Sequence, residues 1–222
     1  MIRVLLLAEG QTEETFVNEV LGPHLEARGI WLTPVVVATK RVRVGGKFRG
    51  GVSSWRQIEG EIRRLLRDSA AAAVTTLLDY YGLPGDVPGM SDRPPVGPRA
   101  RVEHVESRMG EVVADRRFRP HVVLHEYEAW IFSDLTACRW VFDDDPGACS
   151  CLDAVAFAVG TPEDIDDGPA TAPSKHLQRC FEAYDKVLHG PLAVGAIGLD
   201  RVRARCPHFA SWLGWLESLG PL

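Results

Sequence analysis

Four apolar runs along the chain have the pattern of strands in a parallel sheet. Ile2–Ala8 is almost continuously apolar, as expected for a strand that is covered on both faces. Residues 31–38, 73–78 and 120–126 are similar runs. Helical patterns separate these runs, and such alternation favours right-handed crossovers. We therefore predict an α/β fold with a mostly parallel four-stranded sheet and helices on both faces.

Helical periodicity continues after the last of these runs. In the first part of the chain we predict helices from residue 12 to 25 and over 54–68, 99–117 and 127–135. Beyond residue 173 we predict only helices, over 174–188, 191–197, 199–205 and 209–219. We therefore expect one domain, 1–222, made of an α/β core (1–135), an acidic loop region (136–173) with one short helix around 152–159, and a helical C-terminal subdomain (174–222).

Carboxylates stand at the ends of three predicted strands. Glu9 follows the first strand, Asp79 the third and Glu126 the fourth, with Glu128 two residues further on. The carboxyl ends of parallel strands lie at one edge of a sheet, where ligands bind in open α/β folds. Crowded carboxylates repel one another, and hard oxygen ligands select Mg²⁺, Mn²⁺ or Ca²⁺. The pattern predicts a metal site that acts on phosphates.

Each of these acids also has a purely structural interpretation. Glu9 and Glu13 can stabilise the positive N-terminus of the first helix, at about 0.3–1 kcal/mol each. Asp79 can begin a turn, as aspartates often do. Glu126 and Glu128 share a face only if the strand gives way to a helix between them.

Four further residues are candidates for substrate binding: Glu13, Tyr81, His125 and Lys175. Tyr81 can stack on a base or pack beside the sheet. His125 can shuttle protons near neutral pH or serve as a hydrogen-bonded core residue. Lys175 stands at a predicted helix start, where it can hold a phosphate or neutralise the acidic segment before it.

The net charge of −5 is unevenly distributed along the chain. Residues 40–67 contain nine basic and two acidic side chains, and residues 134–167 contain nine acidic and one basic. The basic segment, with its glycines 45, 46, 50 and 51, is either an arm that lies along phosphates or a solvated hairpin and helix.

Cysteines and hydropathy narrow the class of protein further. Five cysteines without C-x-x-C spacing support neither a disulfide framework nor a zinc ribbon, so we expect buried, inert thiols. No stretch approaches the roughly 18 apolar residues of a membrane span, and no leader pattern precedes the first strand. We expect a cytoplasmic protein.

Several short motifs resemble a bacterial family catalogued as domain-of-unknown-function family 4276. They are AEGQTE (8–13), LDYYGLP (78–84), HEYEAW (125–130), PSK (173–175), IGL (197–199) and CPHF (206–209). The resemblance covers nearly the whole chain. That family is similar to Toprim domains, the metal-binding modules of topoisomerases, primases and OLD-type nucleases, and its members often accompany ATPases in mobile or defence gene clusters.

The resemblance implies roles for particular residues. Glu9 matches the Toprim glutamate that serves as metal ligand or general acid–base, and Asp79 matches the first aspartate of the Asp-x-Asp pair. Tyr81 stands where the second aspartate is expected, and a tyrosine does not hold a divalent cation as a carboxylate does. A complete site therefore requires Glu126 or Glu128 as a substitute.

Two functions follow from these observations. The first is a nuclease or phosphoesterase that uses Mg²⁺ or Mn²⁺, with Glu9, Asp79 and Glu126 as catalytic residues and nucleic acid as a partner, in a bacterial defence system. The alternative is a non-catalytic partner subunit of an ATPase with a degenerate metal site. Assembly as a homo-oligomer fits either. Neither G-x-x-x-x-G-K-[ST] nor G-x-G-x-x-G occurs, so nucleotide binding is the weakest option.

Overall fold

A parallel sheet forms the centre of the computed structural model, which describes residues 1–37, 42–44, 47–49, 54–165, 168 and 170–221. Among these residues the sheet has five strands in the order β2-β1-β5-β6, with β7 also paired to β5. The strands are β1 (Ile2–Ala8), β2 (Ile30–Val36), β5 (Ala73–Asp79), β6 (Phe118–Arg119) and β7 (Val122–Val123). Every pair in this sheet is parallel, which confirms the predicted α/β sheet.

Of the predicted strand over 120–126, only Val122–Val123 forms a strand, β7, and the separate short strand β6 precedes the predicted range. Pro120 between them has no backbone N–H to donate to a neighbouring strand. The next residue, His121, forms two hydrogen bonds with the side chain of Thr76. The backbone N–H of His121 donates to Thr76 Oγ1 at 2.9 Å, and the Thr76 hydroxyl donates to the backbone carbonyl of His121 at 2.8 Å. The Thr76 hydroxyl thus takes the place of a ladder partner at the interruption.

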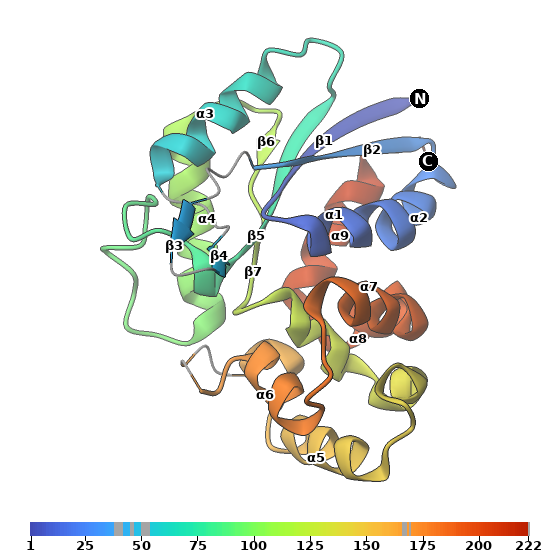
Figure 1. Ribbon diagram of the computed structural model, residues 1–222. Coiled ribbons are helices and arrows are strands. Elements are labelled where there is room, and N and C mark those ends of the chain that lie inside the picture. The colour runs from blue at the N-terminus through green and yellow to red at the C-terminus, as the bar shows by residue number, and fades with distance from the viewer. Residues whose placement is uncertain (38–41, 45–46, 50–53, 166–167, 169, 222) are drawn as a thin grey trace.

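Helices cover both faces of the sheet, as predicted (Figure 1). On one face lie α3 (Trp55–Leu66) and α4 (Pro98–Val113). On the other lie α1 (Gln11–Phe16), the π-helical turn η1 (Val17–Leu21), α2 (Gly22–Glu26) and α9 (Pro207–Ser218). Alternate residues of β1 serve the two layers: Leu6 packs in a cluster with Phe16, whereas Leu7 packs in a cluster with Ile58.

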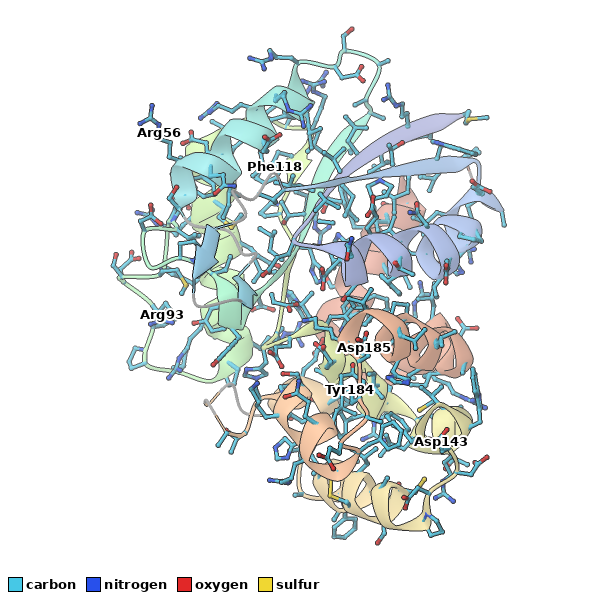
Figure 2. The ribbon with its side chains drawn as sticks, in the orientation of Figure 1. Arg56, Arg93, Phe118, Asp143, Tyr184 and Asp185 are labelled. Atoms are coloured by element: carbon cyan, nitrogen blue, oxygen red, sulfur yellow. A yellow bond between two sulfur atoms is a disulfide. The ribbon has the colours of Figure 1, made fainter. Side chains whose placement is uncertain are left out.

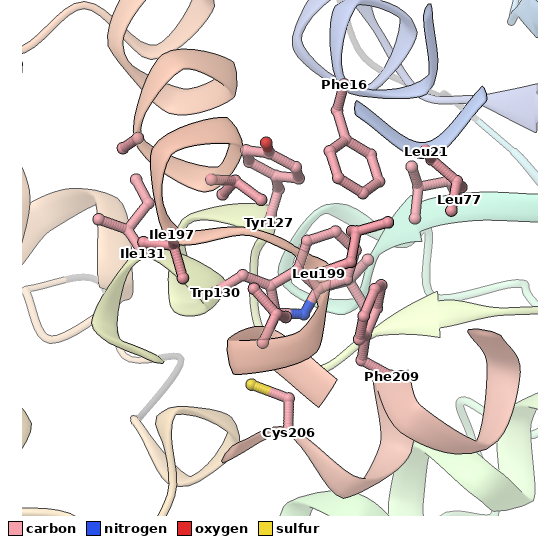
Figure 3. Packing of buried hydrophobic residues seen from close by; sticks show 14 of the residues in the cluster. Phe16, Leu21, Leu77, Tyr127, Trp130, Ile131, Ile197, Leu199, Cys206 and Phe209 are labelled. Atoms are coloured by element: carbon pink, nitrogen blue, oxygen red, sulfur yellow. The ribbon is translucent and has the colours of Figure 1, made fainter. Parts of the chain in front are cut away.

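The larger core joins the sheet to the C-terminal helices. Figure 3 shows Phe16, Tyr127, Trp130 and Phe209 packed together, and the Trp130 ring centroid lies 4.6 Å from that of Phe209 and 5.3 Å from that of Phe16. Apolar burial on this scale holds the segment after β7 firmly against α1 and α9. The backbone that carries the predicted site residues is therefore fixed from both sides.

The segment 136–173, expected as an acidic loop region, is largely helical. It contains most of η4 (Leu135–Phe142), and all of α5 (Pro146–Phe157) and η5 (Pro162–Asp164). The connections around the site add η2 (Tyr80–Gly82) and η3 (Tyr127–Ser133). The Asp145 side chain accepts hydrogen bonds from Gly147 N and Ala148 N, so an acid of this segment caps α5. The division of the chain at residues 135 and 173 stays a prediction.

The predicted helical C-terminal part is confirmed, but one of its boundaries was wrong. The expected helix over 174–188 is two helices, α6 (Pro173–Cys180) and the start of α7 (Lys186–Ile197), with a break between them. Asp185 caps α7 by accepting a hydrogen bond from Leu188 N at 2.9 Å. Next come α8 (Leu199–Arg205) and α9. The break places Lys186 in the first turn of α7.

The basic segment forms a hairpin followed by a helix. β3 (Val42–Val44) pairs antiparallel with β4 (Lys47–Arg49). Glycines 45, 46, 50 and 51 of this segment lie outside the described residues. In α3, Arg63 and Arg64 pair with Glu59 and Glu61 at the surface. That helix therefore matches the solvated alternative. No helix in the described part of the chain combines the length and apolar character of a membrane span.

Two cysteines depart from the expectation of inert thiols. Cys151 of α5 and Cys180 at the end of α6 form a disulfide, whereas Cys138, Cys149 and Cys206 are free and buried. The pair is 29 residues apart in the chain. The spacing of the cysteines in the sequence could not indicate this disulfide, because the two residues meet only when α6 packs against α5.

We expect reduction of this disulfide to lower the free energy of unfolding by about 3–4 kcal/mol, because it closes a loop of 29 residues. The measurement is urea unfolding with and without dithiothreitol. Cys151→Ser should remove the response to reductant. Cys149→Ser, in the same helix, should keep it, and an equal response in both variants would contradict the assignment.

Candidate functional site

The ends of two neighbouring strands bring Glu9 and Asp79 together. β1 and β5 pair in register, with Ala8 opposite Leu77, so the next residues of both strands leave the sheet at the same edge. Glu9 Oε2 accepts a hydrogen bond from the backbone N–H of Asp79 at 3.0 Å. The predicted convergence of these two acids is therefore present, and Glu9 is oriented by its neighbour rather than by the helix that follows.

A sharp turn after β7 delivers the remaining acids to this edge. His125 has a φ of 65°, in the left-handed region, and its carbonyl accepts a hydrogen bond from Tyr81 N at 2.9 Å. Two residues later, Tyr127 N donates to Asp79 Oδ1 at 2.9 Å. Asp79 thus anchors the start of η3, and its side chain does not cap the turn that follows it, contrary to the structural alternative.

Glu126 is held by the start of α6. Its Oε2 accepts a hydrogen bond from Ser174 N at 2.9 Å, and its Oε1 accepts one from Ser174 Oγ at 3.1 Å. A helix N-terminus offers unpaired N–H groups and a positive potential, which suits a carboxylate. The C-terminal helices therefore determine the orientation of an acid that the sheet supplies.

Glu128 is fully buried and faces Lys186. Within the described part of the chain, Lys186 is the one lysine that pairs with these acids. Lys186 Nζ lies 3.1 Å from Glu128 Oε2 and 3.2 Å from Asp79 Oδ2. Figure 2 shows Tyr184 and Asp185 just before Lys186, where the chain passes from α6 to α7. Sequence reasoning missed Lys186, because it treated 174–188 as one helix. Asp185 as a helix-capping residue was the available signal.

Glu13 makes the helix-capping contact that the purely structural interpretation predicts, and it also lies among the strand-end acids. Its Oε2 accepts a hydrogen bond from Gly10 N at 2.9 Å, which makes it part of the cap of α1. The side chain is buried, and it lies close enough to Asp79 and Glu9 for their charges to act on it.

Burial and mutual repulsion raise the pKa of three of these acids. Burial, followed by the charge of Asp79, raises the pKa of Glu9 to about 7 and that of Glu13 to about 8. Burial raises the pKa of Glu128 to about 8, although Lys186 opposes that shift. Although burial acts in the opposite direction, the Asp79 and Glu128 carboxylates raise the pKa of Lys186 well above its ordinary value. Five acids thus face one ammonium.

These residues fit a hard divalent cation. All of the acids offer oxygen, which Mg²⁺ and Mn²⁺ prefer. Glu128 Oε1 is buried and has no hydrogen-bond partner within the described ranges, and the same is true of the hydroxyls of Tyr127 and Tyr184. That Glu9, Asp79, Glu126 and Glu128 hold an ion stays a prediction, and Glu13 lies beside them.

The other predicted substrate-binding residues are placed differently. Tyr81 follows Asp79 at the strand edge and is 45% exposed. The His125 ring bonds the carbonyl of Glu163 at 3.1 Å and is buried, as in its structural alternative. Lys175 is exposed on α6, where its Nζ donates to Gln178 Oε1 at 3.4 Å. Their roles toward a substrate stay predictions.

Comparison with known proteins gives two solved structures that are similar over nearly their whole length. The C-terminal region of the Burkholderia pseudomallei OLD protein has 15% identity and a TM-score of 0.46, covering 99% of this chain and 98% of that one. The C-terminal region of the Xanthomonas campestris pv. campestris OLD protein has 15% identity and a TM-score of 0.36, covering 97% and 98%.

No curated protein matches the chain at a significant level. A family model, described as Domain of unknown function (DUF4276), matches residues 8–217. This match extends from the end of β1 through most of α9 and includes every candidate site residue. The resemblance inferred from the motifs is thereby confirmed, and the chain belongs to this family.

Proposed function

We propose that the protein is a Mg²⁺- or Mn²⁺-dependent enzyme that cleaves phosphodiester bonds, with nucleic acid as its substrate class. The observation that carries this proposal is the gathering of Glu9, Asp79, Glu126 and Glu128 at one edge of the sheet, beside Glu13 and Lys186. Such an excess of buried carboxyl oxygens is costly unless cations share it.

Asp79 and Glu128 supply the central oxygen ligands in this proposal. Asp79 is fixed by Tyr127 N, and Glu128 would substitute for the second aspartate of the Toprim pattern, whose place in the sequence Tyr81 takes. A divalent cation bound there would polarise a phosphoryl oxygen and lower the pKa of a water molecule. Glu126, held by Ser174, is oriented toward the same edge and completes the set of acids.

Glu9 is the residue we assign to proton transfer. Its pKa of about 7, raised chiefly by burial, lets it exist in both protonation states near neutral pH. The backbone N–H of Asp79 donates a hydrogen bond to Glu9 Oε2. If residue 82 had a side chain in place of glycine, its Cβ would lie only 3.1 Å from Glu9 Oε1. A small residue at position 82 therefore leaves room at the carboxyl.

Lys186 is the residue we assign to stabilising charge. Its ammonium bridges Asp79 and Glu128, so a cation bound by both acids would displace it from between them. Lys186 is 36% exposed, which lets the ammonium turn toward a phosphate without leaving the edge. Fixed positive charge at the place where negative charge develops is a large term in such catalysis.

Calorimetric titration of Mg²⁺ and Mn²⁺ into wild type and Asp79→Asn, followed by a plasmid-nicking assay, tests the proposal. We expect the variant to bind the ions at least about 10-fold more weakly and to lose nicking, because a ligand carboxylate is replaced by an amide. Asp153→Asn is the control, since Asp153 forms an exposed ion pair with Arg139. Nicking that persists in Asp79→Asn would overturn the proposal, and a parallel assay with RNA identifies the substrate class.

The second candidate function is a non-catalytic partner subunit of an ATPase. Tyr81 at the position of the second Toprim aspartate and Lys186 between Asp79 and Glu128 favour a degenerate site. The family's association with ATPases and defence gene clusters, implied by the resemblance, makes an ATPase the partner to test. Nicking that appears only when the ATPase is added would join the two functions, and metal binding without nicking in its presence would favour this one.

A further inference from the structure

A second group of possible metal ligands lies where α4, the β6–β7 connection and α9 meet. Glu106 comes from α4, His121 stands between the two short strands, and His208 lies in the first turn of α9. Each residue offers one ligand atom, and these atoms all lie within 4.8 Å of one another. The group is separate from the acids at the strand ends, and the proposed function assigns it no role.

Two distances from the imidazoles to the carboxylate are close to the edge length of a tetrahedral metal site. His208 Nε2 lies 3.1 Å from Glu106 Oε2, and His121 Nδ1 lies 3.5 Å from Glu106 Oε1. Ligand atoms bound to one tetrahedral Zn²⁺ are about 3.3 Å apart, given bonds of about 2.0–2.1 Å. The three ligand atoms all lie within 4.8 Å of one another, so binding one ion would draw the side chains closer together.

Neighbouring groups hold the two imidazoles in place. The His121 ring stacks on Trp212 with a centroid distance of 4.3 Å and on His208 with a centroid distance of 4.7 Å. Trp212 Nε1 in turn donates to Thr75 Oγ1 at 3.0 Å. The carboxylate of Glu163 accepts hydrogen bonds from His208 N and the next backbone N–H of α9, which fixes the start of the helix. Ligands held this firmly lose little freedom when they bind an ion.

One buried ring nitrogen of the group has no partner. His121 is 2% exposed, and its Nε2 makes no hydrogen bond within the described part of the chain. If Nδ1 carries the proton toward Glu106, Nε2 keeps a buried lone pair. If Nε2 carries it, the Nδ1 lone pair faces a carboxylate oxygen. Either tautomer leaves one nitrogen unsatisfied; coordination of Nδ1 would replace the unfavourable contact of its lone pair with the carboxylate, and the proton would then lie on Nε2.

A cavity of about 200 Å³ opens beside the three residues, with Arg119 and Ser211 also in its lining. This volume has room for water molecules, so an ion held by three protein ligands could complete its coordination with solvent. Three protein ligands and one open position are the usual arrangement of exchangeable zinc sites.

We infer that Glu106, His121 and His208 bind a transition-metal ion of the zinc class, with water from the cavity as a further ligand. Two imidazole nitrogens select Zn²⁺, Co²⁺, Ni²⁺ or Cu²⁺ over Mg²⁺, because Mg²⁺ prefers oxygen. The ion would connect α4, the sheet and α9. The chain would then hold two ions of different chemistry, a hard one at the strand ends and a softer one here.

Co²⁺ titration in the presence of excess millimolar Mg²⁺ tests the inference, because Mg²⁺ keeps Co²⁺ away from the acids at the strand ends. We expect one Co²⁺ per chain and the strong visible absorption of a four- or five-coordinate ion with nitrogen ligands. His208→Gln and Glu106→Gln should weaken Co²⁺ binding at least about 100-fold, since each removes a ligand. Asp79→Asn should leave it unchanged, which separates this site from the proposed function.

His24→Gln is the matched control. His24 Nε2 lies 2.7 Å from Glu217 Oε1 of α9, so these two residues also form a histidine–glutamate pair. Within the described residues, no second histidine pairs with Glu217. Its loss should not alter Co²⁺ binding. The weak spectrum of a six-coordinate ion, or equal affinity in His208→Gln and wild type, would overturn the inference.

A measurement on the wild type does not depend on whether the variants fold. Long-range ¹H–¹⁵N spectra of the histidine rings should show one ring nitrogen each of His121 and His208 shifting on addition of one equivalent of Zn²⁺. The ring nitrogens of His24 should stay in place. Unchanged His121 and His208 signals at saturating Zn²⁺ would show that the three residues form a hydrogen-bonded network and not a metal site.

Discussion

Lys186→Met is expected to reduce phosphodiester cleavage by about 100- to 1000-fold while leaving Mg²⁺ affinity equal to that of the wild type or higher. The ammonium neutralises Asp79 and Glu128, so its removal makes the remaining acids more attractive to a cation. The rate falls because no fixed positive charge remains beside the phosphate. Nicking rates measured at saturating Mg²⁺, with affinities from calorimetry, separate the two effects.

The same variant should be less stable in EDTA at pH 8. Removing one partner of a buried ion pair costs about 3–5 kcal/mol, and we expect about 2 kcal/mol here because Lys186 is 36% exposed. Arg201→Met is the control, since Arg201 is exposed and its ion pair with the partly buried Asp134 should contribute less than about 1 kcal/mol. Full activity in Lys186→Met would remove Lys186 from the mechanism and leave it as a structural counter-ion.

The strand-end acids illustrate what a single sequence reveals. The apolar runs of β1 and β5 identify strands, and parallel strands must end at one edge, so Glu9 and Asp79 were predicted to meet. Glu126 and Glu128 were also predicted there, although the reason differs. The strand expected to carry them is interrupted at Pro120, and the left-handed turn at His125 brings them to the edge.

Contacts between distant segments account for what the sequence did not reveal. Lys186 lies 107 positions after Asp79, and helical periodicity that continues from 174 to 188 concealed the start of α7. The ligands Glu106, His121 and His208 come from three elements, and none of them has a neighbour in sequence that marks it as a ligand. Local patterns identify elements and their ends, whereas such clusters depend on how the elements pack.

The free energy of unfolding in EDTA is expected to fall by about 4–5 kcal/mol between pH 6.5 and 8.5. The pKa of Glu9, about 7, and those of Glu13 and Glu128, about 8, lie above the ordinary value of 4.5. Across this window the folded protein therefore binds more protons than the unfolded chain, and stability decreases as pH rises. Each extra proton bound by the folded state costs about 1.4 kcal/mol per pH unit.

Other shifted groups act outside this window. Burial lowers the pKa of His121 to about 4, so the unfolded chain binds that proton more tightly and stability increases with pH only up to about 6.5. The pKa of Lys186 is raised above the ordinary lysine value of 10.5. Its contribution to the free energy of unfolding is therefore lost only at pH values above that range. Urea unfolding between pH 6.5 and 8.5 therefore reports chiefly the strand-end acids.

Glu128→Gln and Mg²⁺ should each flatten this dependence, for different reasons. The variant replaces a titrating acid with a neutral amide, so the loss of stability between pH 6.5 and 8.5 should fall by about two fifths. Saturating Mg²⁺ binds the ionised acids, so its stabilising effect should grow with pH and cancel the loss. Glu111→Gln, which changes an exposed carboxyl paired with Arg108, should keep the wild-type slope. A slope that Mg²⁺ does not alter would mean that the buried acids titrate without binding a cation, and the site would then be structural.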